Sequence, residues 1–280
     1  MFFTFALSVQ SLSPIPPVNL NHFFITVDRK TFDAIHRSKW LKETFAEVVM
    51  GTNTSGDRTW TGLYLYGVGS YIEIFAADEK RKEGSAGVGF LTATTGGADI
   101  VFDQFRRSPF GTRAERELMM MGTKTLQEPY AHTVSYSGQE KTNLNLWLME
   151  YHSEYYKSEG APVGASEAEI FAADRSKHKA PYGGMMADLR SLTLRPFGDG
   201  KDIKLALGLF GYQQVKGQKI WRREMNELRV LPTLSSKSRY GISSVRFSLR
   251  TKPSRTHIEH FGPKCQLRVS RYGTAEWRFR

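Results

Sequence analysis

The segment Glu47-Val-Val-Met-Gly-Thr52 returns later in the chain as Glu117-Leu-Met-Met-Met-Gly-Thr123. The same dipeptide lies upstream of each copy, Arg37-Ser38 before the first and Arg107-Ser108 before the second. The distance between the two dipeptides equals the distance between the two segments to within one residue. This agreement indicates an internal duplication. A repeat of this length is typical of duplicated subdomains rather than of a solenoid.

The residues around the first copy predict a strand, a helix and then three strands. The run 20–27 is aromatic and β-branched, as strands are, and 31–38 has apolar residues at helical spacing. Thr31 is the expected N-cap of that helix. The three following strands are expected at 45–52, 59–66 and 71–75, with turn residues between the first two.

The second unit repeats this order. A strand is expected at 87–94, a helix at 98–107 and a last strand at 143–151, which follows a hairpin near Ser137-Gly-Gln-Glu140. We therefore predict an α+β fold in which residues 18–152 form a duplicated βαβββ domain.

The pattern is looser beyond residue 152. Residues 153–187 are rich in Gly, Ala, Ser and charge and are interpreted as a connector. Residues 188–280 are expected to form a basic, β-rich α+β part with a helix at 202–209 and strands at 191–195, 220–231, 242–249, 266–269 and 275–279. A degenerate third unit is one interpretation of that order.

Charge is concentrated in the C-terminal part. The 280-residue chain has a net charge of +11, and residues 201–280 hold 18 Lys and Arg against 5 Asp and Glu. These cations are either solvated strand faces or a surface that contacts anionic partners. Nucleic acid is an unlikely partner, because no nucleic-acid motif accompanies the charge. The single cysteine, Cys265, excludes an internal disulfide and a cysteine-based zinc site.

Residues 1–17 are interpreted as an N-terminal extension or the remnant of a signal peptide. An apolar run at 2–9 precedes the proline-rich stretch 13–17, but the basic start of a signal peptide is absent. The run is much shorter than a transmembrane helix requires. Export to the periplasm or medium and a cytoplasmic location therefore both remain open.

Several stretches resemble the vicinal-oxygen-chelate superfamily, which includes glyoxalases and bleomycin-resistance proteins, and in particular an uncharacterised branch of it. They are Leu20-Asn-His-Phe23, Trp60-Thr-Gly-Leu-Tyr-Leu-Tyr-Gly67, Tyr71-Ile-Glu-Ile-Phe75 and Trp147-Leu-Met-Glu-Tyr-His152. The resemblance implies curled mixed sheets that enclose a cleft. It also implies a metal-dependent lyase, isomerase or oxygenase acting on a small molecule with vicinal oxygens.

The resemblance further implies a divalent metal ion, Zn, Fe, Mn or Ni, held by the first and last strands of each unit. It assigns His22, Glu73 and Glu150 as metal ligands, with Glu73, Glu150 or His152 moving the proton. Glu73 and Glu150 occupy matching places in the last strands, where a buried carboxylate is costly unless it is paired or coordinated. Unit two has no counterpart of His22, because residues 87–90 offer no ligand.

Simpler roles compete with the metal site. His22 can bond a backbone carbonyl, Glu73 can pair with Arg58, and Glu150 can pair with His152. A metal-free protein that binds or sequesters a small ligand is the alternative function, with a wall formed by Tyr64, Tyr66, Tyr71, Phe75 and Trp147. A third alternative is an envelope or surface interaction protein that acts through its basic C-terminal part.

Overall fold

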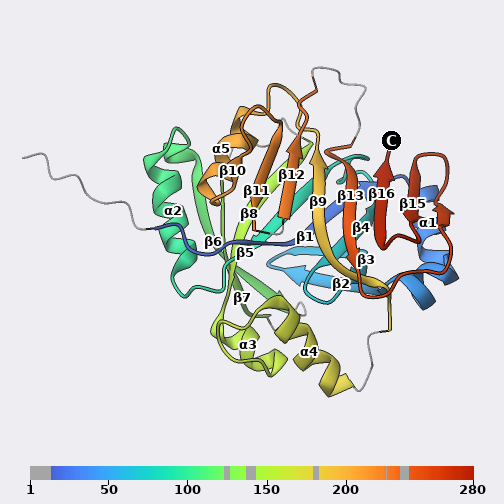
Figure 1. Cartoon of the computed structure of the whole chain (residues 1–280). Coiled ribbons are helices and arrows are strands. Elements are labelled where there is room, and N and C mark those ends of the chain that lie inside the picture. The colour runs from blue at the N-terminus through green and yellow to red at the C-terminus, as the bar shows by residue number, and fades with distance from the viewer. Residues whose placement is uncertain (1–13, 123–126, 137–142, 179–182, 225, 234–239) are drawn as a thin grey trace, which may run out of the picture.

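The computed structural model describes residues 14–122, 127–136, 143–178, 183–224, 226–233 and 240–280 (Figure 1). Residues 1–13, which hold most of the expected extension, lie outside these ranges, as does the Ser137-Gly-Gln-Glu140 turn. Within the ranges, no helix combines the length and apolar character that crossing a membrane requires.

The first half of the chain contains two βαβββ units, which confirms the predicted duplication. Unit one comprises β1 (Asn19–Val27), α1 (Arg29–Arg37), the π-helical turn Leu41–Phe45, β2 (Glu47–Ser55), β3 (Arg58–Tyr66) and β4 (Tyr71–Ala76). Unit two comprises β5 (Ala86–Leu91), α2 (Gly97–Arg107), the 3-10 turn Gly111–Arg113, β6 (Ala114–Gly122), β7 (Gln127–Tyr136) and β8 (Leu144–Tyr151).

The eight strands close into a barrel in the order β1-β4-β3-β2-β6-β7-β8-β5. Each unit begins with a strand that runs parallel to its last strand, β1 beside β4 and β5 beside β8, because a helix provides the crossover. The units join through antiparallel β1 and β5. Only the pair Thr54–Gly122 links β2 to β6 in the described residues, so this seam is much thinner than the other junctions.

Helix α1 shows how sequence sets these elements. Its N-cap is Asp28 rather than the expected Thr31: the carboxylate accepts hydrogen bonds from the Thr31 backbone N–H at 3.0 Å and from the Thr31 hydroxyl at 2.9 Å. Phe32 and Ile35 face inward, one turn apart, and are buried. The helix is therefore fixed by its first turn and by its apolar stripe.

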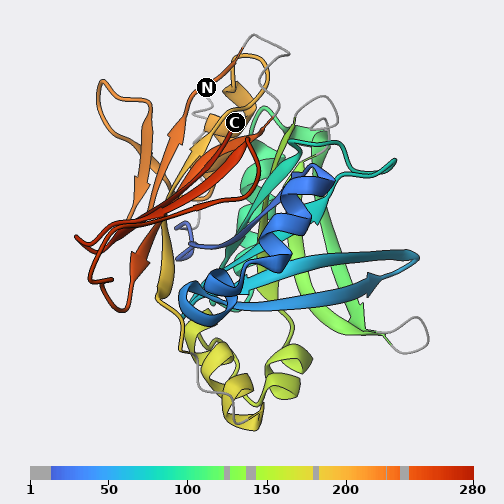
Figure 2. The same cartoon turned by 90° about the vertical axis from the view of Figure 1, so that its right-hand side faces the viewer.

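The expected connector contains two helices. They are α3 (Ser153–Glu159) and α4 (Glu167–His178), and they lie together beneath the barrel in both views (Figures 1 and 2). The sequence did not predict them, because α3 is only 7 residues long and the apolar residues of α4 do not follow a clear helical period.

The C-terminal part forms a second eight-stranded sheet. Its elements are β9 (Met186–Leu194), α5 (Lys201–Leu209), β10 (Gln213–Gln214), β11 (Ile220–Arg223), β12 (Asn226–Val230), β13 (Ile242–Leu249), β14 (His257–His260), β15 (Cys265–Val269) and β16 (Thr274–Phe279). The single strand expected at 220–231 is wrong. It is the hairpin β11–β12, which turns at Glu224, a residue in the left-handed region with φ of 48°.

The second sheet has the same spatial plan as the barrel. Its order is β10-β11-β12-β9-β13-β16-β15-β14, in which β9, α5 and β10–β12 repeat the order of unit one. The remaining four strands, β13 to β16, differ in two ways. No helix lies between β13 and β14, and β13 runs antiparallel to β16, whereas the first and last strands of each barrel unit are parallel. An antiparallel pair needs no long crossover, so the missing helix accounts for the reversed strand direction.

One face of this sheet packs against the outside of the barrel (Figure 2). Phe90 of β5 meets Phe210 at a centroid distance of 4.8 Å, and Phe45 meets Phe247 at 5.6 Å. The backbone also joins the layers, since the N–H of Val68 donates to the carbonyl of Ala187 at 2.6 Å. The barrel wall and the second sheet therefore share one continuous hydrophobic core.

Candidate functional site: the cavity of the barrel

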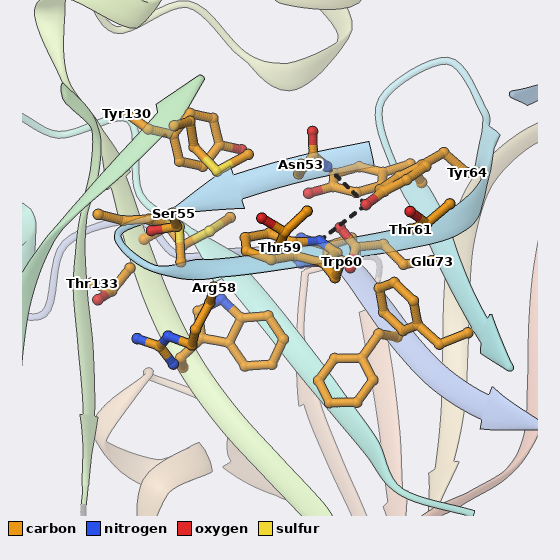
Figure 3. A pocket seen from close by; sticks show the side chains of 18 of the residues that line it. Asn53, Ser55, Arg58, Thr59, Trp60, Thr61, Tyr64, Glu73, Tyr130 and Thr133 are labelled. Atoms are coloured by element: carbon orange, nitrogen blue, oxygen red, sulfur yellow. Dashed lines mark hydrogen bonds between the residues drawn. The ribbon is translucent and has the colours of Figure 1, made fainter. Parts of the chain in front are cut away.

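A cavity of about 1700 Å³ occupies the barrel (Figure 3). Its wall is strongly aromatic, with thirteen Phe, Tyr and Trp side chains among the described residues. Strands of both units and the helices α1, α3 and α4 contribute to the lining, whereas no described residue of 188–280 does. The C-terminal sheet is thus a peripheral layer with respect to this cavity.

All five aromatic residues expected to line a pocket are in this wall: Tyr64, Tyr66, Tyr71, Phe75 and Trp147. Tyr64 is the best fixed of them. Its hydroxyl oxygen accepts hydrogen bonds from Asn53 Nδ2 at 2.7 Å and from Trp60 Nε1 at 3.1 Å (Figure 3). Because both bonds are accepted, the hydroxyl proton remains available for donation. That any of the five contacts a ligand stays a prediction.

Glu73 lies on the cavity side of β4, where Tyr71 and Phe75 share its face. Burial raises the pKa of its carboxyl to about 8, and the positive charge of Arg81 opposes that rise only in part. The guanidinium of Arg81 lies 4.1 Å from the centroid of the Phe75 ring. The alternative of a pair with Arg58 is wrong, because Arg58 lies 3.8 Å from Glu117 instead.

His22 also lies on the cavity side, yet it is 3% exposed. Its Nδ1 is 2.6 Å from Asn21 Oδ1, and its ring stacks on Tyr71 at a centroid distance of 4.4 Å. Burial lowers the pKa of His22 to about 3, so the ring is neutral at physiological pH. The neighbour is thus a side-chain amide rather than the backbone carbonyl considered above.

The missing ligand in unit two has a steric cause. A Cβ on Gly89 would lie 2.4 Å from Cε1 of His22, and one on Gly87 would lie 2.4 Å from the Phe24 ring. Glycine in β5 makes room for the rings of the neighbouring strand β1. A second ligand at this place would therefore displace the first.

Glu150 is not in the cavity. Its carboxylate accepts hydrogen bonds from the backbone N–H groups of Gly96 and Ala98, each at 2.8 Å, at the N-terminus of α2. The prediction that it converges with His22 and Glu73 is wrong. Matching the two last strands by sequence put Glu150 on the cavity face, whereas Trp147, Met149 and Tyr151 of β8 line the cavity and Glu150 is on the opposite face.

His152 caps helix α3 rather than facing the cavity. Its Nδ1 accepts a hydrogen bond from the Glu154 N–H at 3.3 Å, and its side chain neither lines the cavity nor pairs with Glu150 among the described residues. The contacts are those of a helix cap, and a role in proton transfer at the cavity has no support from them.

The donor set does not fit the implied metal. In the part of the chain that the structure describes, no three His, Cys, Asp or Glu side chains come together as a metal site. Of the three expected ligands, Glu150 points to the other side of the sheet, and His22 is held by Asn21 and Tyr71. Glu73 alone remains available to a ligand.

Sequence reasoning missed Glu167, which α4 brings to the cavity. This carboxyl is 6% exposed, and its Oε1 accepts a hydrogen bond from the Tyr151 hydroxyl at 3.2 Å. Burial raises the pKa of Glu167 to about 7, while Tyr151 and Asn21 oppose the rise. Asn21 is close enough to lower the pKa of Glu167. Even so, Asn21 Nδ2 and Glu167 Oε2 each lack a hydrogen-bond partner among the described residues. Glu167 lies in the expected connector, where no apolar period predicted a helix that could carry it to the cavity.

Replacing Glu150 by Ala should destabilise the protein by about 1–2 kcal/mol, because two charge-assisted bonds at a helix N-terminus are lost. Urea unfolding measures the effect, with Glu79→Gln in an exposed loop as the control. Ligand binding in the cavity should be unchanged. A loss of binding with unchanged stability would place Glu150 in the site after all.

Comparisons with known proteins support the fold. The model of DUF5829, described as a family of unknown function, matches residues 20–279. No curated protein matches the sequence. A hypothetical protein from Staphylococcus aureus has a similar structure, with a TM-score of 0.51 and 8% identity over 87% of this chain and 95% of its own.

Two further similar structures are named as dioxygenases. A xylose isomerase-like TIM barrel/4-hydroxyphenylpyruvate dioxygenase fusion protein has a TM-score of 0.52 and 13% identity over 85% of this chain, which spans 38% of that protein. Homoprotocatechuate 2,3-dioxygenase from Arthrobacter globiformis has a TM-score of 0.45 and 7% identity, covering 87% of this chain and 66% of its own. The fusion protein, with a TM-score of 0.52 at 13% identity, shows a shared fold and no more.

Proposed function

This chain belongs to the DUF5829 family, and we propose that it binds a small organic molecule inside its barrel without a metal ion. The observation that carries the proposal is the aromatic cavity of about 1700 Å³ within a closed barrel. Ligand sites are typically apolar and aromatic, with a few fixed polar groups. The Tyr64 hydroxyl, Glu73 and Glu167 supply such groups here.

The size of the cavity favours a large or elongated ligand. Typical small-molecule sites occupy about 300–1,000 Å³, and this one is larger. Rings from both units reach the space: Trp147 comes from unit two, whereas Tyr64 and Tyr71 come from unit one. A molecule with several rings or a long chain would contact both units at once.

A metal-dependent lyase, isomerase or oxygenase is the competing function, because the fold resembles that of a dioxygenase fusion protein. Its expected ligands do not converge, so we favour the binding function. Metal analysis of protein purified without a His tag separates the two. The binding function predicts much less than one divalent ion per chain, whereas one tightly bound ion would favour the enzyme.

N-Phenyl-1-naphthylamine is a neutral dye that fluoresces in apolar surroundings, and it tests the proposal directly. The full chain should bind it saturably, and Trp147→Ala should weaken binding about tenfold, because one ring contact contributes about 1.4 kcal/mol. Tyr272, 72% exposed on the C-terminal sheet, provides the control Tyr272→Ala. Absence of saturable binding, or an equal loss in both variants, would refute the proposal.

A further inference from the structure

We propose that the molecule held in this cavity is an organic cation, a protonated amine or a quaternary ammonium compound, which lies between the carboxylates of Glu73 and Glu167. The inference rests on the proposed binding function and adds the chemical class of the ligand. It follows from the charge of the lining, from two carboxyl groups that form no ion pair among the described residues, and from the rings that surround them.

The lining is acidic although the protein is basic. The whole chain carries +11, yet the described lining holds eight Asp and Glu against four Lys and Arg. Three of the four cations are already in use: Arg58 faces Glu117 at 3.8 Å, Arg29 pairs with Asp33 at 3.0 Å, and Arg81 covers the Phe75 ring. A cavity with this balance attracts cations and repels anions.

Two of these carboxyl groups are shielded from bulk water to different degrees: Glu167 is buried, and Glu73 is half-buried on the cavity side of β4. Glu167 has no ion pair among the described residues, its Oε1 has only the neutral Tyr151 hydroxyl, and its Oε2 has no hydrogen-bond partner there. Glu73 makes no hydrogen bond or ion pair in the same ranges, and Arg81 compensates its charge only in part. A buried carboxylate without a counter-ion is costly, so a cation would stabilise both groups.

The surrounding rings suit a cation rather than a metal. Tyr71 and Tyr66, with centroids 5.8 Å apart, both contact Phe171 of α4 on one side of the cavity. Tyr130, Tyr151 and Tyr155 form a second group, in which Tyr130 and Tyr155 are 4.7 Å apart. Electron-rich aromatic faces attract alkylammonium groups, and such rings together with carboxylates are a recurrent means of binding them. Small hard metal ions instead require several converging oxygen ligands, which are absent from the described residues.

The two carboxyl groups come from different elements of the cavity wall, and both act on the pKa of Tyr71, which lies in the same lining. Glu73 projects from β4 of unit one, and Glu167 projects from α4 beyond the barrel strands. Figure 3 shows Glu73 close to the Tyr64 hydroxyl network, with Tyr130 on the other side of the space. A ligand with one ammonium group can use either carboxylate, and a diamine can use both.

A matched pair of probes tests the charge. Phenyltrimethylammonium and tert-butylbenzene have nearly the same shape, and only the first is charged. Each is used to displace N-phenyl-1-naphthylamine from the full chain at pH 8.5. We expect the cation to compete at least tenfold better than its neutral counterpart, and its affinity to rise about tenfold from pH 6 to pH 9 as the carboxyl groups ionise.

The double variant Glu73→Gln, Glu167→Gln should prefer the cation over its neutral counterpart by less than twofold, each affinity being measured against the variant's own dye affinity. Glu79→Gln, which removes an exposed carboxylate outside the lining, should retain the preference. If the double variant does not fold, the single variant Glu167→Gln and the pH series of the natural protein provide the same test.

The outcomes separate the two proposals. Dye binding without any preference for the cation, or a preference that persists in the double variant, would overturn the cationic ligand and leave the binding function intact. No dye binding at all would refute the binding function itself.

Discussion

At pH 9, Glu73→Gln is expected to be more stable than the natural protein by about 2–4 kcal/mol, whereas at pH 5 the two should be nearly equal. The pKa of Glu73 is raised in the folded protein from 4.5 to about 8. A shift of this size corresponds to about 5 kcal/mol, and water in the cavity screens part of it. The neutral amide of Gln avoids the cost of the buried charge.

The sign follows from proton binding. Between pH 4.5 and pH 8 the folded state keeps the Glu73 proton that the unfolded state has lost, so the stability of the natural protein falls as pH rises. Below pH 4.5 both states are protonated, and Gln resembles a protonated Glu in shape. The difference in the free energy of unfolding between the two proteins should therefore increase progressively from pH 4.5 to pH 8.

Urea unfolding at pH 5, 6, 7, 8 and 9 measures the difference, with Glu79→Gln as the exposed control. The control should track the natural protein at every pH. A Glu73→Gln difference that is constant with pH would mean that Glu73 is solvated or paired in the folded protein. The test needs no ligand and is independent of both proposals.

Trp277→Ala is expected to destabilise the whole protein by about 3–5 kcal/mol. The Trp277 side chain is 0% exposed, and its Nε1 donates to Cys265 Sγ at 2.8 Å. Its ring also stacks on Phe279 at a centroid distance of 5.7 Å. Truncation of a large buried aromatic side chain leaves a cavity and an unpaired thiol, and this cost is among the largest for single substitutions.

The expected effect extends beyond the C-terminal sheet, because the sheet shares its core with the barrel. Chemical unfolding followed both by far-ultraviolet circular dichroism and by cavity-bound dye should show one transition that moves to lower urea in the variant. Tyr272→Ala, at an exposed position, should leave it unchanged. Two separate transitions, with only one displaced, would show that residues 188–280 fold as an independent domain.

Much of the barrel could be predicted from the sequence because its signals are local. The run at 20–27, the helix after Asp28 and the duplicated strand at Met50 and Met121 each carry their own period or turn chemistry. The hairpin at Glu224 could not be predicted this way. Its two strands are short and follow one another almost directly, so they look like one strand of ordinary length.

The site was harder to predict than the fold, because the face on which a strand residue lies depends on how the two last strands are aligned. The choice of face for Glu150 depended on which residue of β8 matches Glu73, and the sequence offers no marker for that. Glu73 and the aromatic wall were identified because strand alternation puts Tyr71, Glu73 and Phe75 on one face. Glu167 depends on how α4 packs under the barrel, and long-range packing of this kind has no local signature.

The two barrel units and the two halves of the second sheet differ in strand direction, and this difference has a consequence for the rate of folding. His22 pairs with Tyr71 in the parallel β1–β4 junction, and Gly87 pairs with Asn145 in β5–β8, so each junction closes a chain loop of many tens of residues. Closing such loops costs entropy before the contacts form, which slows folding. The group β13–β16 lacks the helical crossover, and its β14–β15–β16 meander joins neighbours in sequence. We expect the stretch β14–β16 to acquire its pairing fastest, and the parallel junctions of the barrel to set the overall folding time.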